Sequence, residues 1–146
     1  MNVTPAVVAL LKSDEGVDGL VDGRVFGPPG KSQNDPLRVE MRSWGNVPRK
    51  TIVIMASGGA GSGAGARSRA RWVQNRIDLR CYGETPHGAD ILHNAVYRTM
   101  TELQGFTSGD IRLIDAVVGG GPLPGRDSDA DWPYTMGVYM VSAAYR

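Results

Sequence analysis

The pattern of apolar and polar positions predicts several β-strands. The two classes alternate from Leu37 to Ser43 and again from Trp72 to Tyr82, which is the spacing of a half-buried strand. In the second segment one face carries an apolar row that only Asn75 interrupts: Val73, Ile77, Leu79 and Cys81. The segment from Thr51 to Met55 is rich in β-branched residues and is predicted to be another strand.

Two more strands are expected in the last third of the chain. One covers Ile111 to Val118, and a longer one covers Trp132 to Tyr145, where Met136, Val138 and Met140 share a face. The segment between them, Gly119 to Gly125, is dominated by glycine and proline and is predicted to be a loop.

Helical spacing is clearest between Thr85 and Gly105. Thr85 is the expected N-cap, Pro86 suits the first helical position, and Gly105 stands where a C-terminal glycine belongs. Apolar residues recur here every three or four positions and form a stripe: Ala89, Leu92, Val96, Met100 and Leu103. A shorter helix is expected at the start of the chain, with Thr4 as its cap and Pro5 as its first residue. After it, a short apolar group leads into Arg24-Val-Phe26: Val17, Leu20 and Val21.

These elements predict an α+β fold for a single domain of residues 1–146. We expect one mostly antiparallel sheet of about four to five strands, with a long helix packed across it and a short N-terminal helix. A chain of 146 residues can bury a core without disulfides or metal ions, and its only cysteine, Cys81, has no partner for an intrachain disulfide. The N-terminus lacks the pattern of a signal peptide, and no apolar run approaches the roughly 20 residues of a membrane helix.

The sequence contains 20 glycines, and the segment from Ala56 to Ala66 offers almost no side chains that pack. We expect this segment to form the tip of a long glycine-rich hairpin. A phosphate-binding loop would require a helix directly after it, whereas Arg69 to Asp78 has the periodicity of a strand. The Gly-Lys-Ser/Thr ending of such loops is also missing, so the hairpin is favoured over a nucleotide site.

Candidate metal ligands and nucleophiles do not form a recognisable site. His87 and His93 are six positions apart on the predicted helix and therefore point to different faces. Asp127, Asp129 and Asp131 resemble the start of a calcium loop, but Trp132 and Val138 stand where that loop needs Gly and Glu. Cys81 lies on the inward face of a strand, and nothing selects a catalytic pair among the scattered carboxylates. We therefore expect no enzymatic activity and no cofactor or metal site.

Basic and acidic residues are unevenly distributed. Residues 49–80 hold seven basic side chains and one acid, whereas residues 101–146 hold six acids and three bases. Such a polarity is compatible with chance, and it suits head-to-tail contact between identical subunits equally well. The candidate contact residues are Arg67, Arg69, Arg71, Arg76, Arg80, Asp127, Asp129 and Asp131.

The first three of these arginines also suit a nucleic-acid surface. They occupy every second position and would form one row on a strand beside Trp72, within reach of phosphates. The alternative is that they keep an exposed strand soluble or pair with acids of a neighbouring subunit.

The order of elements resembles the tail terminator (tail-completion, minor tail) proteins of long-tailed bacteriophages. The resemblance covers nearly the whole chain and is most specific from Val73 to Gly83, a strand that turns directly into the long helix. Three shorter patterns accompany it: Ala9-Leu-Leu-Lys12, Leu20-Val-Asp-Gly-Arg-Val25 and Pro36-Leu-Arg-Val39. The glycine-rich segment after Ala56 is longer than in such proteins.

The resemblance implies a structural virion protein with no membrane association. Its copies would form a ring, typically a hexamer, at the head-proximal end of the tail tube, after assembly in the host cytoplasm. The partners would be the tail-tube protein and the head–tail connector, and DNA would pass through the channel without sequence recognition. The hairpin Ser57 to Arg71 would reach the tube or a neck protein. Two other functions stay open: a head–tail connector or stopper, and a nucleic-acid-binding accessory protein.

Overall fold

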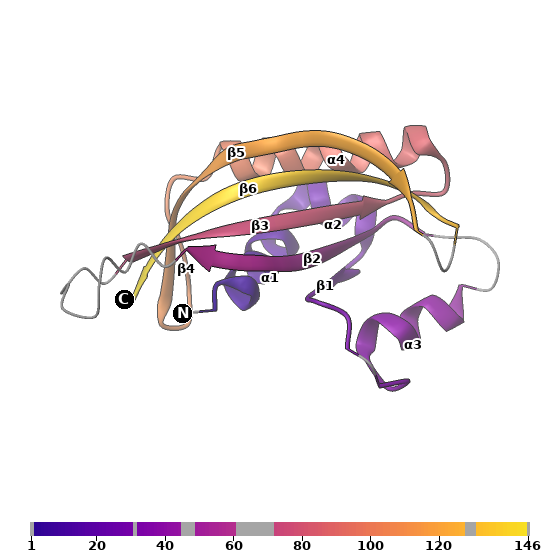
Figure 1. Cartoon of the computed structure of the whole chain (residues 1–146), viewed down its shortest axis with the longest axis horizontal. Coiled ribbons are helices and arrows are strands. Elements are labelled where there is room, and N and C mark those ends of the chain that lie inside the picture. Colours follow the sequence, from indigo (N-terminus) through magenta and orange to yellow (C-terminus); the bar gives the residue numbers. More distant parts are fainter. Residues whose placement is uncertain (1, 31, 45–48, 61–71, 128–130, 146) are drawn as a thin grey trace.

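The computed structural model describes residues 2–30, 32–44, 49–60, 72–127 and 131–145, without the side chains of residues 56–60 and 72 (Figure 1). The described residues form four helices: α1 (Thr4–Ser13), α2 (Glu15–Val21), α3 (Pro36–Ser43) and α4 (Pro86–Thr101). They also form six strands: β1 (Val25–Phe26), β2 (Thr51–Ala60), β3 (Trp72–Tyr82), β4 (Phe106–Ser108), β5 (Ile111–Arg126) and β6 (Pro133–Tyr145).

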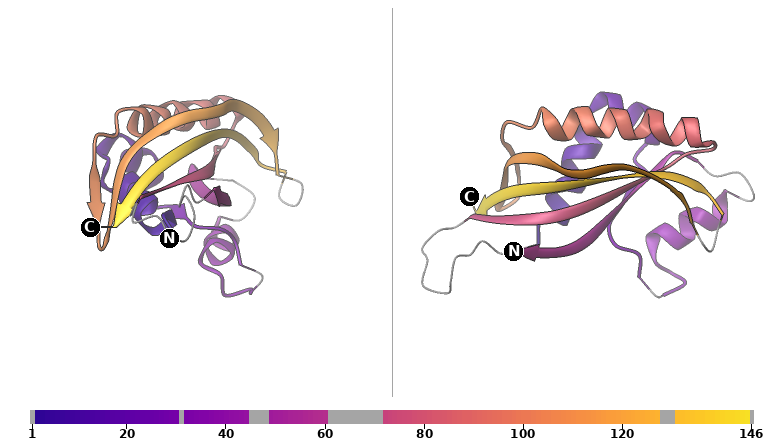
Figure 2. Two further views of the ribbon diagram at one scale, coloured as in Figure 1. Left: turned by 60° about the vertical axis from the view of Figure 1, so that its left-hand side comes forward. Right: turned by 45° about the horizontal axis from the view of Figure 1, so that its top comes forward.

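All six strands belong to one sheet in the order β1-β2-β3-β6-β5-β4. Every neighbouring pair is antiparallel except β1 and β2, which are parallel. The long strands β5 and β6 arch together, so the sheet is strongly curled (Figure 2). The predicted α+β class and the mostly antiparallel sheet are confirmed, but the described sheet has six strands where four to five were expected.

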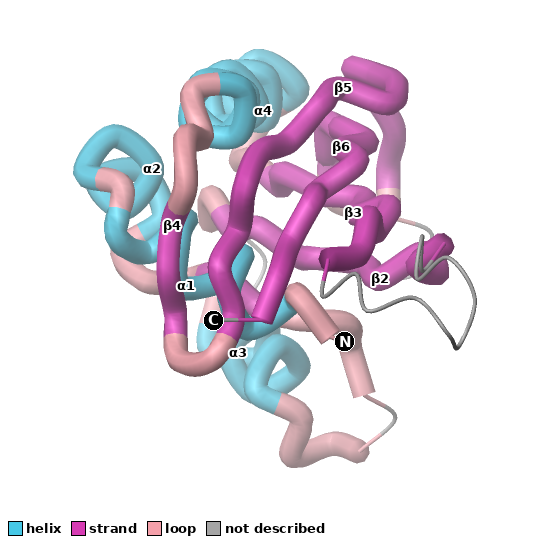
Figure 3. Tube along the Cα trace, turned by 90° about the vertical axis from the view of Figure 1, so that its left-hand side faces the viewer, coloured by secondary structure: helices cyan, strands magenta, loops and turns pink. Residues whose placement is uncertain are grey.

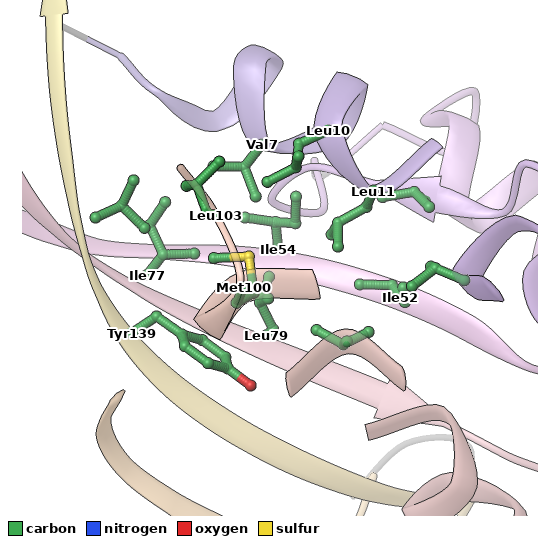
Figure 4. Close-up of a cluster of buried hydrophobic side chains, with 14 of the residues drawn as sticks. Val7, Leu10, Leu11, Ile52, Ile54, Ile77, Leu79, Met100, Leu103 and Tyr139 are labelled. Carbon is green, nitrogen blue, oxygen red and sulfur yellow. The ribbon is translucent and has the colours of Figure 1, made fainter. Parts of the chain in front are cut away.

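Helices α1, α2 and α4 lie on one face of the sheet, whereas α3 lies apart from them (Figure 3). The main core fills the space between these three helices and the inward face of the strands (Figure 4). Its largest side chains are almost completely buried: Leu11, Ile52, Ile54, Ile77, Leu79, Leu92, Met100, Leu113 and Tyr139. Burying an aliphatic side chain of this size contributes about 1.5–3 kcal/mol, so this layer dominates the stability of the fold.

The long helix α4 begins as its local sequence predicts. The Thr85 side chain accepts a hydrogen bond from the backbone N of Gly88 at 3.0 Å, and Pro86 is the first helical residue. The predicted stripe faces the core, and each of its members is buried. The helix ends at Thr101, and Gly105 with φ +96° makes the turn into β4 rather than the helix cap itself.

The predicted strand from Leu37 to Ser43 is wrong, because these residues form helix α3. Asp35 stands at the N-cap position and Pro36 at the start of the helix, which is a common way for a helix to begin. Leu37 and Met41 are four positions apart and pack toward the sheet, while Val39 is exposed. Alternation and helical spacing coincide over so short a segment, since positions 37 and 41 share a face in either structure.

Two further boundaries differ from the sequence-based expectation. Residues Gly119 to Gly125 were predicted to be a loop, but they are part of β5, which continues to Arg126. Register shifts in the pairing with β6 accommodate the irregular backbone of this stretch. The apolar group after the first helix is itself a helix, α2, capped by the Asp14 side chain. Thr4 is the first residue of α1 rather than its cap, and its backbone N donates to the Asn2 side chain at 3.0 Å.

Candidate assembly surfaces

The strands present one face to α4 and the core, and the opposite one, called here the outer face, carries several predicted contact residues. In β3 the inward residues Ile77, Leu79 and Cys81 are fully buried. Arg76 and Arg80 alternate with them and therefore lie on the outer face. Arg80 lies between its cross-strand neighbours Val53 of β2 and Met136 of β6.

The two arginines of β3 are in different environments. Arg76 is half exposed, and its Nε lies 3.2 Å from the Asp78 carboxylate two positions along the strand. Arg80 is partly buried, with its guanidinium carbon 5.0 Å from the centre of the Tyr134 ring. Such a cation–π contact contributes about 0.5–2 kcal/mol and holds the guanidinium against β6. Arg76 is therefore the more accessible of the two for a contact with another subunit.

The acidic loop between β5 and β6 already makes contacts within its own chain. Asp127 accepts a hydrogen bond of 3.0 Å from the Tyr82 hydroxyl. The Asp131 carboxylate lies 3.5 Å from Nη1 of Arg126, but its side chain is 86% exposed. An exposed pair of this kind contributes at most about 1 kcal/mol, so Asp131 remains free to exchange its partner for one on another subunit.

Several predicted contact residues fall outside the described part of the chain. They are Arg67, Arg69, Arg71 and Asp129, together with residues 61–71 of the predicted hairpin. The backbone of β2 is described through Ala60, where it pairs with Gln74 of β3. The basic row and the acidic loop therefore stay predictions as contact surfaces.

An aromatic cluster anchors α3 to the outer face of the sheet. The rings of Trp44 and Trp132 lie 4.8 Å apart, and Trp132 meets the edge of Tyr82 at 6.5 Å between centroids. Tyr82 in turn contacts Tyr134 of β6 at 5.6 Å. Because burial raises the pKa of Tyr82 to about 12, its hydroxyl stays a hydrogen-bond donor at neutral pH.

The sheet has an open edge along most of β5. Strand β4 pairs only with Ile111 to Leu113, so on the side of β5 away from β6 no described strand pairs with the stretch from Ile114 to Arg126. This stretch also exposes four large apolar side chains: Ile114, Val117, Val118 and Leu123. A long strand edge with exposed apolar residues is a template for pairing with another chain.

A second open edge lies on the other side of the sheet. Strand β1 pairs with β2 only at Ile52 and Val53. From Ile54 to Ala60 no described strand pairs with β2 on its side away from β3. Within the described residues the sheet thus has one unpaired edge on each side. The apolar residues from Ile111 to Val118 predict a strand, but they do not show which strands lie beside it.

The described residues contain no group of three or more His, Cys, Asp or Glu side chains that would hold a metal ion. Cys81 is completely buried, and burial raises the pKa of its thiol far above the usual range. His87 is exposed, while His93 lies on the buried side of α4, where burial lowers its pKa. No helix among the described residues is long and apolar enough to cross a membrane.

Comparison with known proteins shows the fold of the chain. No protein-family model matches it, and no curated protein matches it in sequence. Among solved structures, a chain from the virion of a native gene transfer agent particle superposes on it with a TM-score of 0.66. The alignment covers 97% of this chain and 94% of that chain, at 14% sequence identity. The two proteins share one fold over almost their entire lengths.

Proposed function

We propose that the chain is a non-catalytic structural protein of a phage-like virion. The observation that carries this proposal is the fold likeness to a chain of the gene transfer agent virion, which extends over nearly the full length of both. The order of elements around β3 and α4 supports the more specific role of a tail terminator. In that role the protein forms a ring at the head-proximal end of the tail, ends tube polymerisation and joins the tail to the head connector.

The two open edges of the sheet support ring formation. An edge on each side allows β5 of one copy to lie beside β2 of the next, a head-to-tail contact that repeats around a closed ring. Strand pairing satisfies the free backbone groups of both edges, and it buries the apolar side chains of Ile114 and Val117. We propose a hexamer, with DNA passing through its channel without base-specific contacts.

Charged side chains would set the register of this contact. The basic set comprises Arg76 and Arg80 on the outer face, and the acidic set comprises Asp127, Asp129 and Asp131, which follow β5 in the sequence. Opposite charges across an interface accelerate association and disfavour wrong registers more than they add affinity. The segment Ser57 to Arg71, including Arg67, Arg69 and Arg71, is proposed to reach the tail-tube protein or another neck protein.

The test is the oligomer mass of the purified protein, measured alone and with tail-tube subunits, combined with electron microscopy of tube ends. Wild-type protein is expected to form closed rings and to cap tubes. The variant Val117→Lys places a charge on the open edge, where Val117 is 56% exposed, so the isolated subunit should fold normally. The matched control is Val39→Lys on α3, because Val39 is similarly exposed at 47% and lies away from the edge.

Burying a whole valine side chain contributes about 1.5–3 kcal/mol, so the half-exposed Val117 contributes about 1 kcal/mol to the free energy of each contact between subunits. Burying an unpaired ammonium adds to that loss, and we expect each Val117→Lys contact to weaken at least about tenfold. A wild-type protein that stays monomeric at all concentrations and never caps tubes would refute the proposal. Rings located between the connector and a separate terminator would instead assign the protein to the stopper role.

A further inference from the structure

A cavity of about 250 Å³ lies between α3 and the outer face of β2 and β3. Its walls are mainly apolar and come from elements far apart in the sequence. Leu37 and Met41 contribute from α3, Val53 and Met55 from β2, and Arg80 and Tyr82 from β3. The buried lining residues Leu37, Val53 and Tyr82 form a cluster separate from the main core. Figure 1 likewise shows α3 set apart from the helices that cover the other face.

One positively charged group in this cavity lacks a complete set of partners. The Nε atom of Arg80 is buried, and no hydrogen-bond acceptor for it is present among the described residues. A buried donor on a charged group costs several kcal/mol when it stays unpaired, so an acceptor supplied by a ligand would be bound strongly. A second guanidinium, that of Arg38, lies on the cavity wall and donates from its Nε to the Gly30 carbonyl at 3.0 Å.

The only carboxylate on the cavity wall within the described residues is that of Asp127. It accepts the hydrogen bond from the Tyr82 hydroxyl described above. Two guanidinium groups against one carboxylate leave the lining with an excess of positive charge. The chemistry of the cavity therefore matches a ligand that combines an apolar group with a negative charge.

The size of the cavity narrows the choice of ligand. Small-molecule sites usually measure about 300–1,000 Å³, so a volume of about 250 Å³ suits one or two side chains. The last residue of a protein chain carries a carboxylate on the same Cα as its side chain, and both groups then fit in a small space. An internal acidic residue would bring its own backbone and a separate apolar neighbour, which need more room. The two methionines of the wall adapt readily to different aliphatic shapes.

We propose that this cavity binds the C-terminal residue of a partner protein. Its aliphatic side chain lies between Met41 and Met55, and its terminal carboxylate accepts hydrogen bonds from the guanidinium of Arg80. Carboxylate capture by a fixed guanidinium is charge-assisted and bidentate, which gives it both strength and direction. The inference goes beyond ring formation. If Arg80 binds the carboxylate, the more exposed Arg76 is the arginine of β3 that remains for a contact between ring subunits.

Two peptide libraries provide the probe. Both carry the same glycine linker and four randomised C-terminal positions, and they differ only in ending with a free carboxylate or with an amide. Each library is passed over immobilised full-length protein, and retained peptides are quantified by mass spectrometry. The expected result is that free-acid peptides ending in Leu, Ile, Val or Met are retained at least about tenfold more than their amides, since hydrogen bonds to charged groups are the strong ones.

Three variants assign the binding to the cavity. Arg80→Gln should lower retention of the free-acid peptides about tenfold or more, and Met41→Trp should abolish it by filling the space. Arg98→Gln is the matched control, because Arg98 is exposed on α4 and lies on the other side of the sheet. Circular dichroism and melting temperature verify that each variant is folded before its binding is compared.

The comparison of acid and amide libraries uses the wild-type protein and does not depend on any variant. Equal retention of both libraries overturns the proposal. Selective retention of amidated peptides with an internal Asp or Glu also overturns it, because the carboxylate would then come from a side chain. Retention that survives both Arg80→Gln and Met41→Trp places the binding elsewhere on the protein and overturns it as well.

Discussion

The hydroxyl group of Tyr139 predicts a substitution that should stabilise the protein. Tyr139 lies in the middle of β6 with its ring in the main core, and the residue is 1% exposed (Figure 4). Its Oη is buried and has no hydrogen-bond partner among the described residues. Burial accordingly raises the pKa of Tyr139, since the charged form is the more strongly disfavoured one. Folding thus removes the hydroxyl from water without a replacement partner.

The expected gain follows from that desolvation. An unpaired buried polar group costs about 1–3 kcal/mol, and Tyr139→Phe removes the group while it keeps the ring. The phenylalanine leaves a space smaller than one methyl group, which offsets part of the gain. We expect a net stabilisation of about 1 kcal/mol, which corresponds to a rise in melting temperature of about 2–4 °C for a chain near 150 residues.

The assay is urea unfolding at fixed protein concentration, followed by circular dichroism, with a thermal melt as a second measurement. Tyr145→Phe is the control, because Tyr145 is 53% exposed and its hydroxyl stays in water in both states. The control should change the unfolding free energy by no more than about 0.5 kcal/mol. A loss of 1 kcal/mol or more in Tyr139→Phe would refute the reasoning. It would mean that the hydroxyl has a stabilising partner in the folded protein. Nδ1 of His93 is a nearby buried atom that also lacks a partner in the described chain.

Local signals were sufficient to predict α4 and the inward row of β3. Thr85 and Pro86 mark the start of the helix within two residues, and the apolar stripe then continues for four turns. Each signal is repeated by several residues, so a single ambiguous position does not change the prediction. In β3, Ile77, Leu79 and Cys81 repeat the alternation in the same way.

Short segments were predicted less well, because tertiary contacts decide their structure. The seven residues from Leu37 to Ser43 fit both periodicities, and the packing of Leu37 against Val53 and Tyr82 favours the helix. The stretch Gly119 to Gly125 has poor strand propensity, yet β6 pairs with β5 along its length. The hydrogen bonds and the bulges of that pairing outweigh the poor strand propensity of glycine and proline, because strand propensities differ by only about 1 kcal/mol between residue types.

Surfaces that join distant segments were not predictable from local patterns. The sequence predicts Arg80 as a contact residue, but Met41 and Asp127 lie with it on the wall of one cavity, although they come from a helix and a loop far away in the sequence. Their proximity depends on the register of Val53 with Arg80 and on the aromatic contacts that seat α3. The alternation of apolar and polar residues predicts on which face of the sheet a side chain lies. The residues that surround this side chain depend on the order of the strands, which cannot be read from the alternation.

Three further predictions test the fold and its buried titratable groups. Gly83→Ala should destabilise the protein by about 1–3 kcal/mol in urea unfolding, because the added methyl group would collide with the backbone of Gly88 and Ala89. Its control is Gly19→Ala, where the added methyl group meets nothing within 4 Å, so stability should not fall. The Cys81 thiol should react with a disulfide reagent only at the rate of unfolding, and rapid labelling of native protein would contradict its burial. Stability should also fall as the pH drops below about 6.5, because burial lowers the pKa of His93 from its usual 6.5 in the folded state. Below pH 6.5 the unfolded chain therefore binds a proton at His93 that the folded chain does not, and the loss levels off below the folded-state pKa. The urea midpoint of the wild type, measured between about pH 8 and pH 5, should decrease as the pH falls, and that of His93→Gln should not show this decrease. If the midpoints of both proteins changed with pH in parallel, His93 would not be the cause of the pH dependence.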